Sequence, residues 1–265
     1  MIPTRQSGVK DFNKELREVK RLTKKETNRE WTSRVLGSED LQGYIILIGG
    51  TSLTDFRVRV AQSHIRHDMT PSHWSHAAII GNKSGTTDWN LYEVCLNPRR
   101  GFGDVAKENG VQKGKLSQYD DPESFPNIAC INFSIDSKTL NESVRRFRRQ
   151  RSLMDIGSLI VQWLAFVWGV GEYGNPLLKG IGIPSATFVE GAFAGAGLEL
   201  TPGLSTRSSC PEAIWQSARW WYDFYKSGAI SGSAPEGAYA TEPTFDITFG
   251  EGKTRIGLHC CRESE

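Results

Sequence analysis

The stretch Trp74-Ser-His-Ala-Ala-Ile-Ile-Gly81, followed by Leu91-Tyr-Glu-Val94, carries the pattern that decides the fold. Both segments are short apolar runs, and the turn between them, NKSGTTDW, is polar and contains a glycine. Such a pair is typical of a β-hairpin. A third apolar run, Gly43-Tyr-Ile-Ile-Leu-Ile48, closed by two glycines, predicts another buried strand.

The rest of the chain extends this strand-rich start with helices. A fourth strand is expected over 127–133, and helices over 55–66, 137–151, 155–169, 185–196 and 211–226. A last hairpin is expected over 244–260, and residues 97–126 read as a loop. Because strands come early and helices late, we expect an α+β fold with one antiparallel sheet. The expected division is an N-terminal helical arm (1–40, helix-like over 8–36), a core (41–228) and a C-terminal extension with the hairpin (229–265).

Composition limits the classes of function. The 265 residues hold 32 Lys plus Arg against 30 Asp plus Glu, so the formal net charge of +2 argues against a nucleic-acid partner. Five cysteines without a C-x-x-C pair indicate a reducing compartment, and no apolar leader segment is visible. The longest apolar stretch, 159–170, is shorter than the ~20 residues of a membrane span. We therefore expect a cytoplasmic protein, and no cofactor is indicated.

His76 is the first candidate for chemistry. It stands in an apolar strand run, and Glu93 stands in the next one. A carboxylate in such a strand is costly unless it is paired, and a Glu–His pair fixes the imidazole tautomer that a general base needs. The alternative is a buried histidine bound to the backbone and a Glu93 that faces solvent.

A nucleophile would complete such a site. Cys95 and Cys130 lie in apolar strand runs and are expected in the core. Cys210 precedes Pro211 at a helix start, where the helix dipole favours a thiolate. Ser185 lies at another loop-to-helix junction, where a nucleophile would sit at the positive end of a helix. A serine at that position is also a common helix N-cap.

The order of these segments resembles the circularly permuted NlpC-type papain-like superfamily, which includes the lecithin retinol acyltransferase-like enzymes. The resemblance covers roughly residues 41–220 and rests on five segments, 43–48, 74–81, 91–94, 154–159 and 185–200, with Cys210-Pro211 and its helix behind them. It implies a permuted papain-like fold, with the antiparallel sheet packed on a helical half. It also implies a hydrolase or acyltransferase that acts on an amide, ester or thioester.

The resemblance assigns roles to three residues. His76 takes the position of the base, Glu93 that of the orienting residue, and Ser185 that of the nucleophile, since Phe and Val follow it at +3 and +4. Two positions depart from the family pattern: Tyr44 stands where Asp is usual, and Ser185 stands where Cys is usual. A serine hydroxyl is harder to activate than a thiol. The chain could thus hold a genuine serine nucleophile, an engineered Cys-to-Ser change, or the site of an inactive binding module.

Further residues are candidates for contact with the substrate. His73, Tyr44 and Trp74 flank the predicted site, and His73 could also meet an oxyanion. The oxyanion itself would be bound by backbone N–H groups at the start of the 185 helix. A small molecule, a peptide or an acyl or lipid group is the expected substrate.

Two other patterns suggest different partners. His64, His67, His73 and His76 have i, i+3 spacings that would suit a metal-dependent hydrolase, with Asp68 or Glu93 nearby. His76 is expected on a strand, however, where i and i+3 point to opposite faces, so no metal is assigned. The basic run with Arg145, Arg148 and Arg149, followed by an apolar helix with Trp163 and Trp168, suggests a peripheral contact with a membrane.

Overall fold

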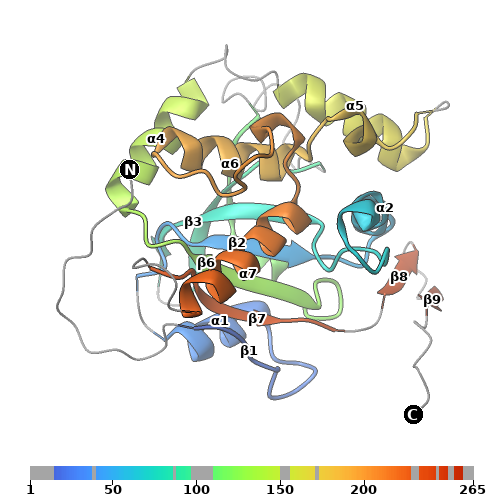
Figure 1. The fold of residues 1–265 in the computed structure, drawn as a ribbon. Helices are drawn as coiled ribbons and strands as arrows, with labels where there is room; N and C mark the ends of the chain where they lie inside the picture. The colour runs from blue at the N-terminus through green and yellow to red at the C-terminus, as the bar shows by residue number, and fades with distance from the viewer. Residues whose placement is uncertain are drawn as a thin grey trace.

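The computed structural model describes residues 15–37, 40–85, 88–96, 110–149, 156–170, 173–227, 233–242, 245–249 and 254–258. These residues form a mixed α/β structure around one large sheet (Figure 1). Within the described residues, no helix has both the length and the apolar character that crossing a bilayer requires.

The sheet has seven strands in the described part of the chain, in the order β1-β7-β6-β2-β3-β4-β5. Neighbouring strands are antiparallel, except for β1 and β7, which run parallel. The sheet is therefore mixed, whereas a fully antiparallel sheet was expected. Its strands are β1 (Leu16–Glu18), β2 (Ile45–Gly49), β3 (His76–Ser84), β4 (Asp88–Glu93), β5 (Gln112–Lys115), β6 (Asn127–Asn132) and β7 (Glu236–Ala240).

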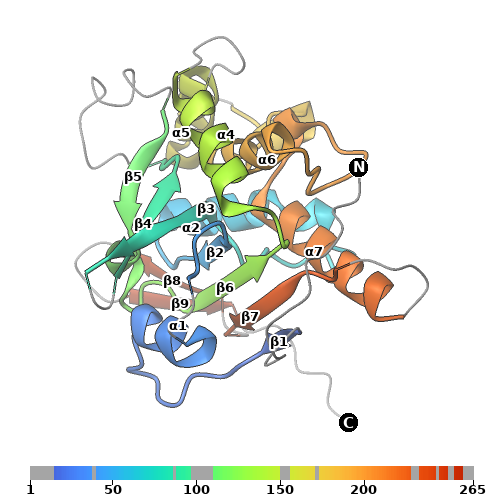
Figure 2. The ribbon, with the colours of Figure 1, turned by 90° about the vertical axis from the view of Figure 1, so that its left-hand side faces the viewer.

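Helices cover the two faces of the sheet unequally. The α-helices of the described residues are α1 (Asn28–Leu36), α2 (Leu53–Ala61), α4 (Ser137–Arg149), α5 (Ile156–Trp168), α6 (Pro184–Gly195) and α7 (Pro211–Lys226). Five of them pack against one face, together with Leu47, Ala77 and Ile79. The other face, with Ile48 and Ala78, packs against residues of α1 and of the short 3-10 helix η2 (Leu116–Tyr119). Figure 2 shows α1 on the side of the sheet away from α4 and α6. Because side chains alternate along β3, His76 lies on the η2 side and Ala77 on the α6 side.

Most of the predicted core elements are confirmed. The apolar runs around 44–48, 75–80, 90–96 and 127–133 are strands β2, β3, β4 and β6, and the five predicted helices correspond to α2, α4, α5, α6 and α7. The predicted last hairpin is also present, as β8 (Phe245–Phe249) paired with β9 (Thr254–Leu258).

The flanking segments differ from the prediction. The expected helix over 8–36 begins only at Asn28, where Thr27 forms a capping box with Glu30, and the preceding residues 16–18 form β1. The predicted loop over 97–126 contains β5 and η2. The extension that starts at 229 supplies β7, which pairs with β6, so both flanks add strands to the main sheet.

Candidate functional site

His76 and Glu93 form a buried pair at one end of the β3–β4 ladder. The register of this ladder matches Ala78 to Glu93, which places the two polar side chains on the same face of adjacent strands. The Nε2 atom of His76 lies 2.8 Å from Oε2 of Glu93. Only 9% of His76 and 3% of Glu93 are exposed, so this bond is well shielded from water. The expected contact between the two residues is therefore present, and the solvent-facing alternative for Glu93 is wrong.

Tyr119 is a third member of this group, and the sequence pattern did not indicate it. Its hydroxyl donates to Oε2 of Glu93 at 2.6 Å and lies 3.3 Å from Nε2 of His76. Its ring stacks on the imidazole, with centroids 5.4 Å apart. Burial raises the pKa of Tyr119 well above 10, and the nearby Glu93 charge adds to this effect, so the phenol keeps its proton. Tyr119 was not predicted as a site residue because it lies within residues 97–126, which were expected to form a loop.

Gly114 on β5 makes room for the Glu93 carboxylate. A Cβ atom built at this glycine would lie 1.9 Å from Oε1 of Glu93. No side chain can stand so close, and any residue other than glycine would push the carboxylate aside. The edge strand thus fits against one oxygen of Glu93 while His76 and Tyr119 hold the other.

Ser185 reaches the same end of the sheet from the opposite face. Pro184 and Ser185 begin helix α6, and the N-cap is Ile183, so the expectation that Ser185 is the N-cap is wrong. Its Oγ accepts a hydrogen bond of 3.4 Å from the backbone N–H of Ala77, the residue after His76. Ala77 stands one residue beyond the Ala78–Glu93 pair that ends the β3–β4 register. The serine hydroxyl therefore lies beside the strand that carries His76.

The hydrogen bonds of His76 and Ser185 determine which of their atoms can take part in a proton transfer. Since Nε2 of His76 faces Glu93, Nδ1 is the ring nitrogen left to accept a proton. Ser185 is only 2% exposed, and among the described residues its hydroxyl is bonded to the Ala77 backbone and not to the imidazole. A proton transfer from Ser185 to His76 therefore requires the hydroxyl to leave the Ala77 N–H and turn toward the imidazole.

The three residues expected to contact substrate lie at different depths. Trp74 is fully buried and packs edge-on against Trp215, with ring centroids 5.2 Å apart, so it is a core residue. Tyr44 is also buried, on the sheet face that α1 covers. His73 is partly buried, and its carbonyl accepts a hydrogen bond from Asn127. Burial lowers the pKa of His73 to about 4, and the nearby Arg66 and Arg59 charges act in the same direction.

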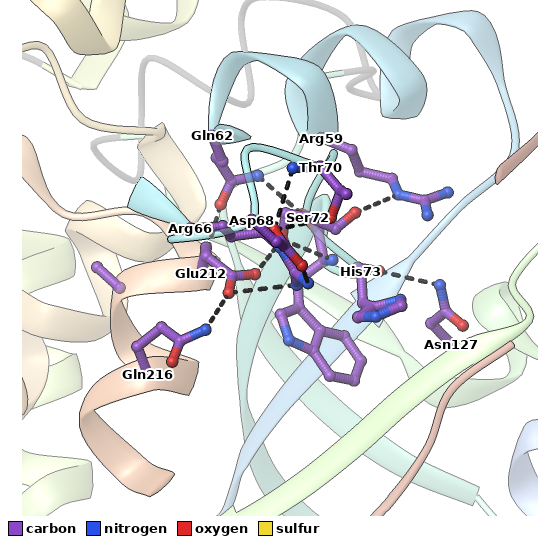
Figure 3. Close-up of polar contacts among 12 residues, drawn as sticks. Arg59, Gln62, Arg66, Asp68, Thr70, Ser72, His73, Asn127, Glu212 and Gln216 are labelled. Atoms are coloured by element: carbon purple, nitrogen blue, oxygen red, sulfur yellow. Dashed lines mark hydrogen bonds and ion pairs between the residues drawn. The ribbon is translucent and has the colours of Figure 1, made fainter. Parts of the chain in front are cut away.

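A buried polar cluster fixes the segment that leads into β3 (Figure 3). Glu212, fully buried at the start of α7, accepts hydrogen bonds of 2.6 Å from Ser72 and from Gln216. The guanidinium of Arg66 lies 3.6 Å from the same carboxylate. On the other side, Arg59 donates to the carbonyl of Ser72 at 2.6 Å, and its burial lowers its pKa to about 10. The residues before His76 are thus anchored between α2 and α7.

Two of the three cysteines in the described part of the chain, Cys130 and Cys210, are not placed for nucleophilic chemistry. Cys130 and Cys210 are buried, and burial raises the pKa of each thiol to about 12. The dipole effect expected for Cys210 is outweighed by this desolvation, although its Sγ does accept from the Ala213 N–H. Cys95 is partly buried, and Cys260 and Cys261 lie outside the described residues.

The alternative metal site has no support in the geometry. Across the described ranges, which include all four histidines of the 64–76 segment, no three His, Cys, Asp or Glu side chains come together as metal ligands would. His64 instead lies against the carbonyl of Ala61, at 3.1 Å from Nδ1, and His76 is bonded to Glu93.

The basic residues of α4 lie mostly at the surface. Arg145, Arg146 and Arg149 are exposed and line, with Glu142, a surface hollow of about 420 Å³. Arg148 is partly buried, so it is less available to a partner than its neighbours on the helix.

The two tryptophans of α5 differ in exposure. Trp168 is 61% exposed, whereas Trp163 is fully buried and donates to the carbonyl of Gly182. The inclusion of Trp163 in a membrane-contacting surface is therefore wrong, because its indole N–H is used inside the core.

Comparison with protein-family models, with curated proteins and with solved structures finds no match for this chain.

Proposed function

We propose that this protein is a papain-like hydrolase or acyltransferase that acts on an amide, ester or thioester carbonyl through Ser185, His76 and Glu93. The observation that carries the proposal is the buried 2.8 Å bond between His76 and Glu93. Ser185, in the first turn of α6, accepts a hydrogen bond from the N–H of Ala77, the residue after His76. A histidine fixed by a carboxylate beside such a hydroxyl is the arrangement that acyl-transfer enzymes use on several unrelated folds.

The reaction would run in two steps. Ser185 Oγ attacks the carbonyl carbon while its proton passes to Nδ1 of His76, and the new C–O bond leaves the negative charge on the carbonyl oxygen. When the bond to the leaving group breaks, that group takes the proton from His76, and an acyl ester remains on Ser185. Water, or a second alcohol or amine, then attacks the carbonyl carbon of this ester while His76 takes its proton. The bond to Ser185 Oγ breaks, Oγ recovers the proton from His76, and the acyl product is released.

The start of α6 supports the developing charge. N–H groups in the first turn of a helix have no acceptor inside the helix, and the helix dipole favours a negative charge there. Pro184 has no N–H, so the first donor of this kind is the N–H of Ser185 itself. A carbonyl oxygen placed there would be stabilised as its charge grows, as in an oxyanion hole.

A second candidate is a non-catalytic binding module on the same fold. It is favoured by the burial of Ser185 and by the bond that its hydroxyl receives from Ala77 instead of making one to His76. The experiment that separates the two candidates is covalent labelling at position 185, as the natural serine and as Ser185→Cys, with and without His76→Ala. Labelling that depends on His76 supports the enzyme, and no labelling of either folded form supports the binding module.

For the substrate we propose only a broad chemical class. A small molecule, a peptide or an acyl or lipid group suits the proposed chemistry, and a lipid substrate would agree with the exposed arginines of α4 and with Trp168. These residues are proposed to contact an anionic membrane surface.

A further inference from the structure

We propose that Tyr119 and Gly114 are positioning residues: together they fix the Glu93 carboxylate so that it holds His76 in the tautomer with its proton on Nε2. The inference rests on the proposed function, since a fixed tautomer matters only if His76 accepts a proton during a reaction. Neither residue contacts Nδ1 of His76 or the Ser185 hydroxyl in this assignment. Gly114 acts through Glu93, and Tyr119 acts through Glu93 and through its contact with Nε2 of His76.

Tyr119 and Gly114 both contact the side chain of Glu93. Oε2 of Glu93 is 2.6 Å from the hydroxyl of Tyr119 and 2.8 Å from Nε2 of His76. A carboxylate oxygen has two lone-pair directions, so one oxygen can accept from both donors at once. Oε1 is set against the backbone of Gly114, where no Cβ fits. The carboxylate is thus held at both oxygens, by two donors on one and by close packing on the other.

The tyrosine can act only as a donor toward Glu93. Its hydroxyl is buried and stays protonated, because burial raises the pKa of Tyr119 well above 10. A carboxylate has no proton to give, so the hydrogen of the phenol must point to Oε2. The 3.3 Å approach of the phenol oxygen to Nε2 then adds a second acceptor near the Nε2 proton of the imidazole. Both oxygens around Nε2 favour a proton on that nitrogen and leave Nδ1 with a free lone pair.

Tyr119 is held in place by residues other than His76 and Glu93. Its backbone carbonyl accepts from the Asn28 side chain at 2.5 Å, and its ring packs edge-on against Phe125, with centroids 5.2 Å apart. A tyrosine whose backbone and ring are both held in this way loses little freedom when its hydroxyl makes the bond to Glu93. Such a neighbouring shell is what a precise catalytic geometry requires.

The test is nitrogen-15 NMR of the His76 ring in the full-length protein at neutral pH. The shifts of Nδ1 and Nε2 report which nitrogen carries the proton, and they do so without any substrate. In the wild-type protein we expect the proton on Nε2. In Tyr119→Phe and in Gly114→Ala we expect a mixture of the two tautomers, because the first change removes a donor to Oε2 and the second pushes Oε1 out of its place. Tyr92→Phe, a tyrosine next to Glu93 in sequence and without a described bond to it, is the matched control and should retain the wild-type spectrum.

Activity provides the second readout. If a substrate is found, Tyr119→Phe should lower kcat by about 10- to 100-fold, the range expected for one hydrogen bond to a charged group, with KM nearly unchanged. A wild-type tautomer in both Tyr119→Phe and Gly114→Ala would overturn the inference even if the protein is an active enzyme. The expected tautomer change in a protein that cannot be labelled at Ser185 would keep the inference about geometry and reject the proposed reaction instead.

Discussion

His76 Nε2 and Glu93 Oε2 are 2.8 Å apart in a site from which water is almost excluded. A hydrogen bond between a histidine and a carboxylate is much stronger in such a place than at the surface, because the local dielectric constant is low. The same relationship makes both residues sensitive to substitution. If Glu93 is neutralised, the orientation of His76 is no longer set by a charge.

The first prediction concerns Glu93→Gln. The amide has nearly the shape of the carboxylate but offers an N–H toward Nε2, so it favours the opposite tautomer of His76. We expect kcat for acyl transfer to fall by about 100- to 10,000-fold, because a histidine in the wrong tautomer cannot accept the proton of the nucleophile. Steady-state kinetics, with Asp88→Asn on the same strand as a control, measure it. An unchanged kcat would remove Glu93 from the mechanism.

The second prediction concerns the buried cluster around Glu212. Glu212→Ala leaves Ser72, Gln216 and Arg66 without their shared acceptor in a fully buried place. We expect a loss of about 3 kcal/mol in the free energy of unfolding, because buried polar groups without partners are costly. Urea unfolding measures the loss, and Asp223→Ala, at an exposed position of the same helix, should change the stability by less than about 0.5 kcal/mol. Equal stabilities of the two variants would show that the cluster is not a structural anchor.

The third prediction concerns pH. Burial lowers the pKa of His73 from 6.5 to about 4, so the unfolded chain binds a proton at this residue that the folded protein does not. Above pH 6.5, His73 is neutral in both states, and its burial keeps its full contribution to stability. As the pH falls from 6.5 to 4, the unfolded chain takes up the proton first, and the free energy of unfolding falls by up to about 3 kcal/mol.

His73→Gln removes this titration and should flatten the decline in stability over the same range. Chemical unfolding at several pH values between about 4 and 7 tests it, with His67→Gln at an exposed position as the matched control. A decline as steep in His73→Gln as in the wild-type protein would mean that another group causes the acid sensitivity.

The fourth prediction concerns the surface of α4. Reversing two exposed charges, with Arg145→Glu and Arg149→Glu, should lower binding to phosphatidylserine-containing vesicles more than tenfold, since each basic residue near an anionic surface contributes about 1 kcal/mol. Trp168→Ala should also weaken binding, and Trp220→Ala, another exposed tryptophan, serves as control. Vesicle co-sedimentation measures it. If the wild-type protein does not bind these vesicles, the proposed membrane contact is wrong.

The interior of the fold was predictable because the middle strands of the sheet contain strongly apolar runs. The runs that became β2, β3 and β6 are nearly continuous in Ile, Leu and Ala, and burial on both faces of a central strand requires this pattern. The pairing of His76 with Glu93 followed from the same reasoning, since a charge in such strands needs a partner.

The edges of the sheet could not be predicted in this way. Strand β5 has the sequence QKGK and β1 the sequence LRE, and an edge strand needs few apolar residues. Their place depends on pairing with β4 and β7, which no local pattern in these short segments indicates. Tyr119 lies in the 3-10 helix that follows β5 directly, so its contact with Glu93 was hidden together with the strand.

The most direct test of the proposed reaction is covalent labelling followed by intact mass. The protein and its Ser185→Cys form would be treated with a fluorophosphonate and with a thiol-reactive reagent, each with and without His76→Ala, after circular dichroism has shown that all forms are folded. We predict modification at position 185 in at least one form and a loss of about 100-fold or more in its rate with His76→Ala. Modification at the same rate with and without His76, or none in either folded form, would contradict the assignment of Ser185 and His76 as nucleophile and base.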